Sequence, residues 1–197
     1  LHAPVVLIGT RHPEFDSLYW DDAAGGRAAI EHLLELGHRR IAVITSHTPS
    51  KAQDERVKGA REAMVKGGVD SQLIFSGHTE KHAGFSEEAG YEAMETILHQ
   101  QPPVTAVFAM SDVQALGACK AVKDSGKRVP EDVAVVGYDD IKSSYYIGLS
   151  TVDQRMHWVG EEATEQLLKQ MHDEANEAPI SRLIVPELVA RGSSVKQ

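Results

Sequence analysis

Cysteine is almost absent from this sequence, since Cys119 is the only one among 197 residues. A disulfide within the chain is therefore excluded, which is typical of proteins kept in a reducing cytoplasm. Long apolar runs are missing too: none reaches the length of a membrane span, and no charged segment precedes an apolar core as in a signal peptide. These absences predict a cytoplasmic protein with no membrane contact.

Positive charge is also scarce. The sequence has 20 Lys and Arg against 29 Asp and Glu, which gives a formal net charge of −9. A protein with this negative net charge repels nucleic acids and anionic membranes through its electrostatic field. Any contact with DNA is therefore expected to come from a segment outside this one.

Motifs of catalysis and metal binding are lacking as well. No Gly-rich phosphate loop and no nucleophile elbow occurs, and the VGYDD carboxylates have no partner Lys or Ser/Thr cluster for phosphotransfer. His78 and His82 are four residues apart, but Glu80 stands at the wrong place for a zinc-protease helix, and Gly77 and Gly84 indicate a loop. We therefore predict no enzyme, no cofactor and no metal site.

What the sequence does contain is a regular alternation of strand and helix patterns, with 42% hydrophobic residues to build a core. Buried-type strands are predicted at residues 5–8, 41–45, 73–75, 105–110 and 133–136. Helical periodicity lies between them, at about residues 22–36, 51–66, 86–99 and 111–126. This order predicts an α/β fold with a parallel sheet and right-handed crossovers.

The regularity breaks after Asp140. A Ser/Tyr-rich segment is followed by an apolar run at 149–152, a helix at about 159–171, and closing strands at 182–185 and 188–189. Residues 193–197 have the composition of a frayed end.

Polar side chains follow several of the predicted strands. Asp139 and Asp112 come just after buried strands, Arg56 opens the second helix, and Phe85 precedes the third. Ligands bind at the carboxyl ends of strands in open α/β sheets. Carboxylates and a guanidinium suit neighbouring hydroxyl groups, and an aromatic ring covers a sugar face or stacks on a base. The sequence therefore predicts a site for a polyhydroxylated ring.

Each of these residues has a purely structural alternative. Asp112 could cap its helix, Arg56 could be a solvated helix residue, and Phe85 could belong to the core. Asp140 could face the site in place of Asp139.

Over nearly its whole length, the sequence resembles the effector-binding domain of the LacI/GalR family of bacterial transcriptional regulators. The resemblance is carried by DDAAGGRAAIEHLLELGHRRIAVI, ERVKGAREAM, TAVFAMSDVQALGACKAVKDSGKRVPEDVAVVGYDD, LSTVDQRMHWVGEEATEQLL and VPELVARGSS. It implies a periplasmic-binding-protein-like fold of two parallel-sheet lobes joined by crossover strands, with a small-molecule effector between them. It also implies a homodimer whose lobe movement controls an N-terminal DNA-binding headpiece absent from this chain.

By this resemblance, Arg56 and Asp139 stand at the family's ligand-gripping arginine and carboxylate, and Phe85 at a stacking aromatic. The resemblance also brings in Ser111 with Asp112, at the usual Asn-Asp pair, and Lys58, two residues after the arginine. Gly9 and Met156 depart from the pattern, since many members have an Asp and some an aromatic residue there.

The family layout divides the chain into two lobes. It assigns residues 1–20 and 153–178 to an incomplete N-terminal lobe, 21–152 and 179–191 to the C-terminal lobe, and 192–197 to a tail. Because the sequence lacks an initial Met and reaches a buried-type strand within a few residues, we expect a fragment. The function implied is sensing of a sugar or sugar phosphate by a regulator. A periplasmic sugar-binding receptor is the alternative, and an α/β enzyme is a more distant one.

Overall fold

The computed structural model describes residues 3–77, 84–172 and 178–195. The chain forms two compact units, one made of Leu1–Asp21 and Gln154–Pro186 and a larger one made of Asp22–Asp153 and Glu187–Gln197. Among the described residues, none of the helices is both long enough and apolar enough to cross a membrane.

The larger unit is built on a six-stranded sheet in the order β4-β3-β5-β6-β7-β9. All neighbours pair in parallel except β7 and β9, which are antiparallel. The strands are β3 (Ile41–Thr45), β4 (Ile74–Ser76), β5 (Ala106–Ala109), β6 (Ala134–Tyr138), β7 (Ser150–Asp153) and β9 (Glu187–Val189). Every residue of β5 and β6 is buried, as the continuous apolar runs predict for strands covered on both faces. The predicted α/β class with a mainly parallel sheet is confirmed.

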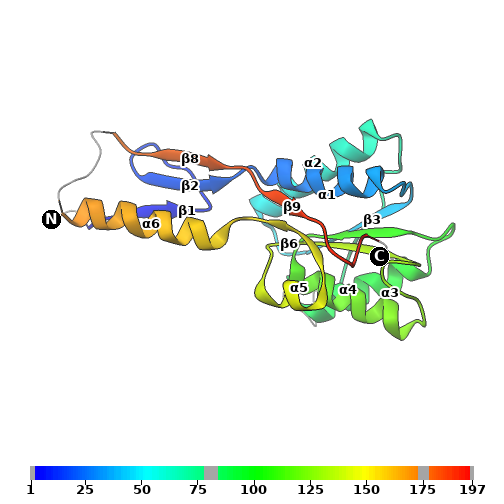
Figure 1. Cartoon of the computed structure of the whole chain (residues 1–197). Helices are drawn as coiled ribbons and strands as arrows, with labels where there is room; N and C mark the ends of the chain where they lie inside the picture. Colours follow the sequence, from blue (N-terminus) through cyan, green and yellow to red (C-terminus); the bar gives the residue numbers. More distant parts are fainter. Residues whose placement is uncertain (1–2, 78–83, 173–177, 196–197) are drawn as a thin grey trace. The chain divides into compact units, whose positions relative to one another are not determined.

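Two helix pairs cover the two faces of this sheet, as Figure 1 shows. One pair is α1 (Asp22–Glu35) and α2 (Lys51–Lys66), and the other is α3 (Glu87–Leu98) and α4 (Asp112–Asp124). A short helix, α5 (Lys142–Ile147), follows β6. Glycines bring the first pair together, since a Cβ on Gly26 would lie 2.0 Å from the Arg56 carbonyl oxygen. The backbone of Arg56 is thereby set directly against α1.

The smaller unit has a parallel sheet in the order β1-β2-β8 and, among its described residues, one helix. Its elements are β1 (Val6–Ile8), β2 (Asp16–Trp20), β8 (Ser181–Ile184) and α6 (Met156–Met171). The sequence did not predict β2, because this strand begins with two polar residues. Asp16 is nonetheless buried, and its carboxylate accepts hydrogen bonds from the Ile180 N–H at 2.6 Å and from the Gln170 amide at 2.8 Å. These partners are distant in sequence, so no local pattern reveals the strand.

The structure divides residues 179–191 differently from the sequence-based layout. Strand β8 pairs with β2, so residues up to Pro186 group with the smaller unit, and only Glu187 onward belongs to the larger one. The expectation of a frayed end is wrong for Ser193 and Ser194, which are both buried. Ser193 Oγ donates to the Val135 carbonyl at 2.6 Å, and its backbone carbonyl accepts from the Val135 N–H. Ser193 is therefore held along β6.

Candidate functional site

Arg56 lies in α2, where the side chain points to the carboxyl ends of β5 and β6. Helix α2 begins after Ser50, whose hydroxyl accepts from the Gln53 N–H. Arg56 Nε donates to Asp22 Oδ1 at 2.8 Å, and Nη1 donates to the Met110 carbonyl at 2.8 Å. The guanidinium also lies 3.7 Å from the centroid of the Tyr138 ring. With 8% of its surface exposed, Arg56 is a fixed, nearly buried cation and not a solvated helix residue.

Asp139 follows β6, and its Oδ1 lies 3.9 Å from Arg56 Nη1. Its φ is 114° and that of Asp140 is 51°, so two consecutive non-glycine residues adopt positive φ. The two carboxylates point to different partners: Asp140 forms an ion pair with Arg191 at 2.7 Å. The structure thus brings Asp139, and not Asp140, to Arg56.

Ser111 and Asp112 take up different positions at the start of α4. Ser111 caps the helix by accepting from the Gln114 N–H at 3.2 Å. Asp112 is fully buried, and its carboxylate accepts hydrogen bonds from the Ile141 N–H, the Ser144 hydroxyl and the Thr151 hydroxyl. Burial raises the pKa of Asp112 above its ordinary value, and these hydrogen bonds oppose the rise. Its polar contacts thus run to the segment after β6 and to β7.

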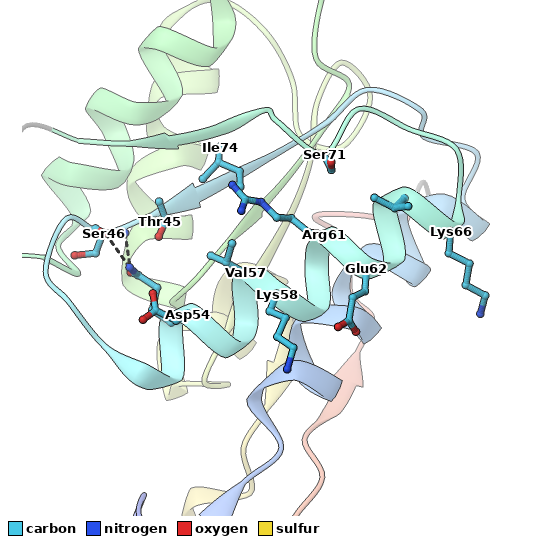
Figure 2. Close-up of a pocket in the computed structure, with 12 residues that line it drawn as sticks. Thr45, Ser46, Asp54, Val57, Lys58, Arg61, Glu62, Lys66, Ser71 and Ile74 are labelled. Atoms are coloured by element: carbon cyan, nitrogen blue, oxygen red, sulfur yellow. Dashed lines mark hydrogen bonds between the residues drawn. The ribbon is translucent and has the colours of Figure 1, made fainter.

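Phe85 and Lys58 differ in burial. Phe85 is half-buried and packs on the core cluster beneath α1 and α2. Lys58 is exposed and pairs with Glu55 at 3.3 Å. It lines an open hollow of about 880 Å³ beside α2 and β4, together with Val57, Arg61 and other residues drawn in Figure 2.

Several residues of this region were missed by the sequence analysis. Asp22 and Tyr138 both contact Arg56, and the Tyr138 hydroxyl lies 3.4 Å from Asp22 Oδ1. Gln53 closes the loop before α2, because its amide bonds both the N–H and the carbonyl of Ser46 at 2.8 Å. Asp22 and Gln53 lie in the first turns of helices, where polar residues are common. Their residue type alone therefore did not identify them as part of this region.

Metal binding finds no support in residues 3–77, 84–172 and 178–195, where no group of three or more His, Cys, Asp or Glu could hold an ion. His78 and His82, which are four residues apart in the sequence, lie outside the described residues.

Known proteins resemble this chain in both sequence and structure. A family model described as a periplasmic binding protein-like domain matches residues 30–194. The regulator CelR of Thermobifida fusca is 37% identical over 177 residues, covering 88% of this chain and 50% of the relative. The repressor PurR of Mannheimia succiniciproducens is 33% identical over 202 residues, covering 99% and 58%. The chain thus spans about half the length of these relatives.

Solved structures agree with this similarity. The structure of a CelR–cellobiose complex matches with a TM-score of 0.78 and 35% identity, covering 94% of this chain and 56% of the other. A LacI transcriptional regulator from a Rhodococcus species matches with a TM-score of 0.82 and 30% identity, covering 97% and 69%. The chain therefore belongs to the periplasmic-binding-protein-like domain family, in the form of the effector-binding domain of LacI/GalR-type transcriptional regulators.

Proposed function

We propose that this chain senses a small neutral sugar for a DNA-binding regulator, and that Arg56 and Asp139 bind the sugar hydroxyl groups. The observation that carries the proposal is the fixed Arg56 guanidinium beside the Asp139 carboxylate, at 3.9 Å, where two strands of the larger sheet end. The guanidinium is held by groups that include Asp22, the Met110 carbonyl and the Tyr138 ring. A preorganised donor next to an acceptor suits the paired hydroxyls of a sugar.

The local charge favours a neutral sugar over a sugar phosphate. Two carboxylates, those of Asp22 and Asp139, lie beside the Arg56 guanidinium. A phosphate group bound to Arg56 would lie close to both carboxylates in a partly desolvated place, where like charges repel strongly. The CelR structure, whose title records cellobiose, supplies a neutral sugar as the first ligand to try.

Regulation requires a ligand that prefers one conformation of the domain. We propose that the sugar binds one arrangement of the two units better than the other and shifts the DNA-binding equilibrium by that difference in affinity. The chain's net charge of −9 is unsuited to DNA, so a separate N-terminal headpiece would contact the operator.

The same proposal includes a homodimer. Helix α5 exposes Tyr145, Tyr146 and Ile147 side by side, with 70% and 73% of the two tyrosines accessible. Grouped apolar side chains of this kind mark contact surfaces. A second copy of the chain would cover them, and Tyr146→Asp should then shift the full-length protein from dimer to monomer in sedimentation. A variant that stays dimeric would remove α5 from the interface.

Calorimetric titration of the full-length protein with cellobiose, ribose and inorganic phosphate tests the ligand. We expect a neutral sugar to bind and phosphate not to. Asp139→Asn removes a charged acceptor and should weaken sugar binding by roughly 10-fold or more. Lys66→Ala, on the exposed side of the same helix as Arg56, is the matched control and should leave binding unchanged. Binding of phosphate alone, or unaltered sugar binding by Asp139→Asn, would contradict the proposal.

A further inference from the structure

The turn that carries Asp139 is strained and is held in place from two sides. Asp139 and Asp140 have φ values of 114° and 51°, in the left-handed region that non-glycine residues rarely adopt. This conformation is energetically unfavourable for a non-glycine residue and persists only when the surrounding structure enforces it. The contacts of this turn show which groups enforce it.

Asp112 supports the turn from the side of α4. Its carboxylate accepts the N–H of Ile141, the residue directly after the strained pair, at 2.9 Å. The Thr151 hydroxyl donates to the same carboxylate and accepts the Asp140 N–H at 3.3 Å. A Cβ on Gly137 would lie 2.2 Å from Asp112 Oδ1. The end of strand β6 therefore leaves room for this carboxylate only because residue 137 is glycine.

Arg191 supports the turn from the side of the C-terminal segment. Its Nη1 donates to Asp140 Oδ1 at 2.7 Å and to the Leu149 carbonyl at 2.8 Å. Its own backbone is fixed to Ser150, because Ser150 Oγ accepts the Arg191 N–H and donates to the Arg191 carbonyl. The guanidinium is mostly buried, with 17% of the side chain exposed. Arg191 is therefore a rigid partner for Asp140.

We infer that Asp112 and Arg191 are positioning residues for Asp139. They hold the Asp139–Asp140 turn in the conformation that turns the Asp139 carboxylate toward Arg56 and the Asp140 carboxylate away from it. Asp112, the helix residue that the family resemblance offered as a ligand contact, acts on the ligand through this turn. The effect on ligand affinity rests on the proposed function, whereas the effect on the turn does not.

Hydrogen exchange tests the inference without any ligand. The Asp139 N–H donates to the Val152 carbonyl, and the Asp140 and Ile141 N–H groups bond Thr151 and Asp112. In Arg191→Lys, which keeps the charge but loses the planar two-acceptor geometry, we expect exchange at residues 139–141 to rise at least 10-fold in the full-length protein. Exchange in β3 and β5 should not change.

Two further variants separate positioning from general stability. Asp140→Asn weakens the ion pair with Arg191 by removing the charge of the other partner. Thr151→Val removes the hydroxyl that bonds both the Asp112 carboxylate and the Asp140 N–H. Both variants should show the same rise in hydrogen exchange at residues 139–141. Arg128→Lys alters an exposed Arg–Asp pair of the same unit and should leave residues 139–141 unchanged. If Arg191→Lys does not fold, Asp140→Asn and Thr151→Val decide the matter.

Unchanged exchange at residues 139–141 in these variants, or a uniform rise over the whole unit, would overturn the inference. Calorimetry with cellobiose then adds the functional readout, where a 10-fold or greater loss of affinity is expected for Arg191→Lys and none for Arg128→Lys. If cellobiose binds neither the variants nor the wild type, the proposal that cellobiose is a ligand is refuted. The hydrogen-exchange result still tests the positioning role in that case. If the wild type binds and Arg191→Lys binds equally well, the positioning role is refuted.

Discussion

The guanidinium of Arg56 lies 3.7 Å from the centroid of the Tyr138 ring, with the Tyr138 side chain fully buried. A cation over a desolvated aromatic ring is stabilised by about 2 kcal/mol. Tyr138 is the last residue of β6 and Asp139 is the next, so the strand that presents the carboxylate also supports its arginine partner.

This relationship predicts a difference between two substitutions of Tyr138. Tyr138→Phe keeps the ring and loses only the hydroxyl contact with Asp22, so we expect a loss of about 1 kcal/mol in the free energy of unfolding. Tyr138→Leu also removes the cation–π contact and should cost about 2 kcal/mol more. Urea denaturation of both variants measures the difference, and equal unfolding midpoints would show that the ring contact contributes nothing.

Gly26 controls the approach of α1 to α2. In Gly26→Ala the new Cβ would lie 2.0 Å from the Arg56 carbonyl oxygen, so one helix must move. We expect a loss of stability of about 1–3 kcal/mol, the usual result of overpacking. Gly160→Ala is the matched control, because its Cβ meets no atom within 4 Å and helix propensity favours alanine by about 1 kcal/mol. Similar destabilisation of both variants would contradict this account.

Ser193 connects the segment that follows β9, residues 190–195, to β6 and β7. Its hydroxyl donates to the Val135 carbonyl at 2.6 Å and accepts the Ser150 N–H at 2.7 Å, all in a buried place. Ser193→Ala leaves both backbone groups without this partner and should destabilise the protein by about 1–3 kcal/mol in urea unfolding. Ser181→Ala, at an exposed position, should change stability by less than about 0.5 kcal/mol. No difference between them would mean that the segment detaches easily.

His32 makes stability depend on pH. Burial lowers the pKa of His32 below its ordinary value of 6.5, Glu35 opposes the shift, and the ring bonds Ser194 Oγ at 2.8 Å. As the pH falls below 6.5, His32 binds a proton in the unfolded chain before it does so in the folded protein. The contribution of His32 to stability is therefore fully present above pH 6.5 and decreases as the pH falls from 6.5 to the pKa of the folded state. His32→Gln should remove this part of the pH dependence. Parallel stability curves for wild type and variant between pH 7.5 and 5 would refute it.

The two residues on which the proposed site is built were predicted from local motifs, and their role in binding stays a prediction. Arg56 and Asp139 follow from the resemblance and from their places in the second predicted helix and after a buried strand, and the structure puts the two side chains 3.9 Å apart. Asp22 and Arg191 were missed, because each is identified only by a partner: Asp22 bonds Arg56, and Arg191 bonds Asp140. No window of local sequence contains both members of either pair.

Local sequence patterns specify the order and type of most elements, because apolar periodicity and caps such as Ser50, Ser86 and Ser111 act within a few residues. Three features could be seen only in the folded chain: β2 is a strand, Asp139 and not Asp140 faces Arg56, and Ser193 is buried. Each of these outcomes depends on hydrogen bonds between residues far apart in the chain, as between Asp140 and Arg191, and such contacts exist only once the sheet has formed.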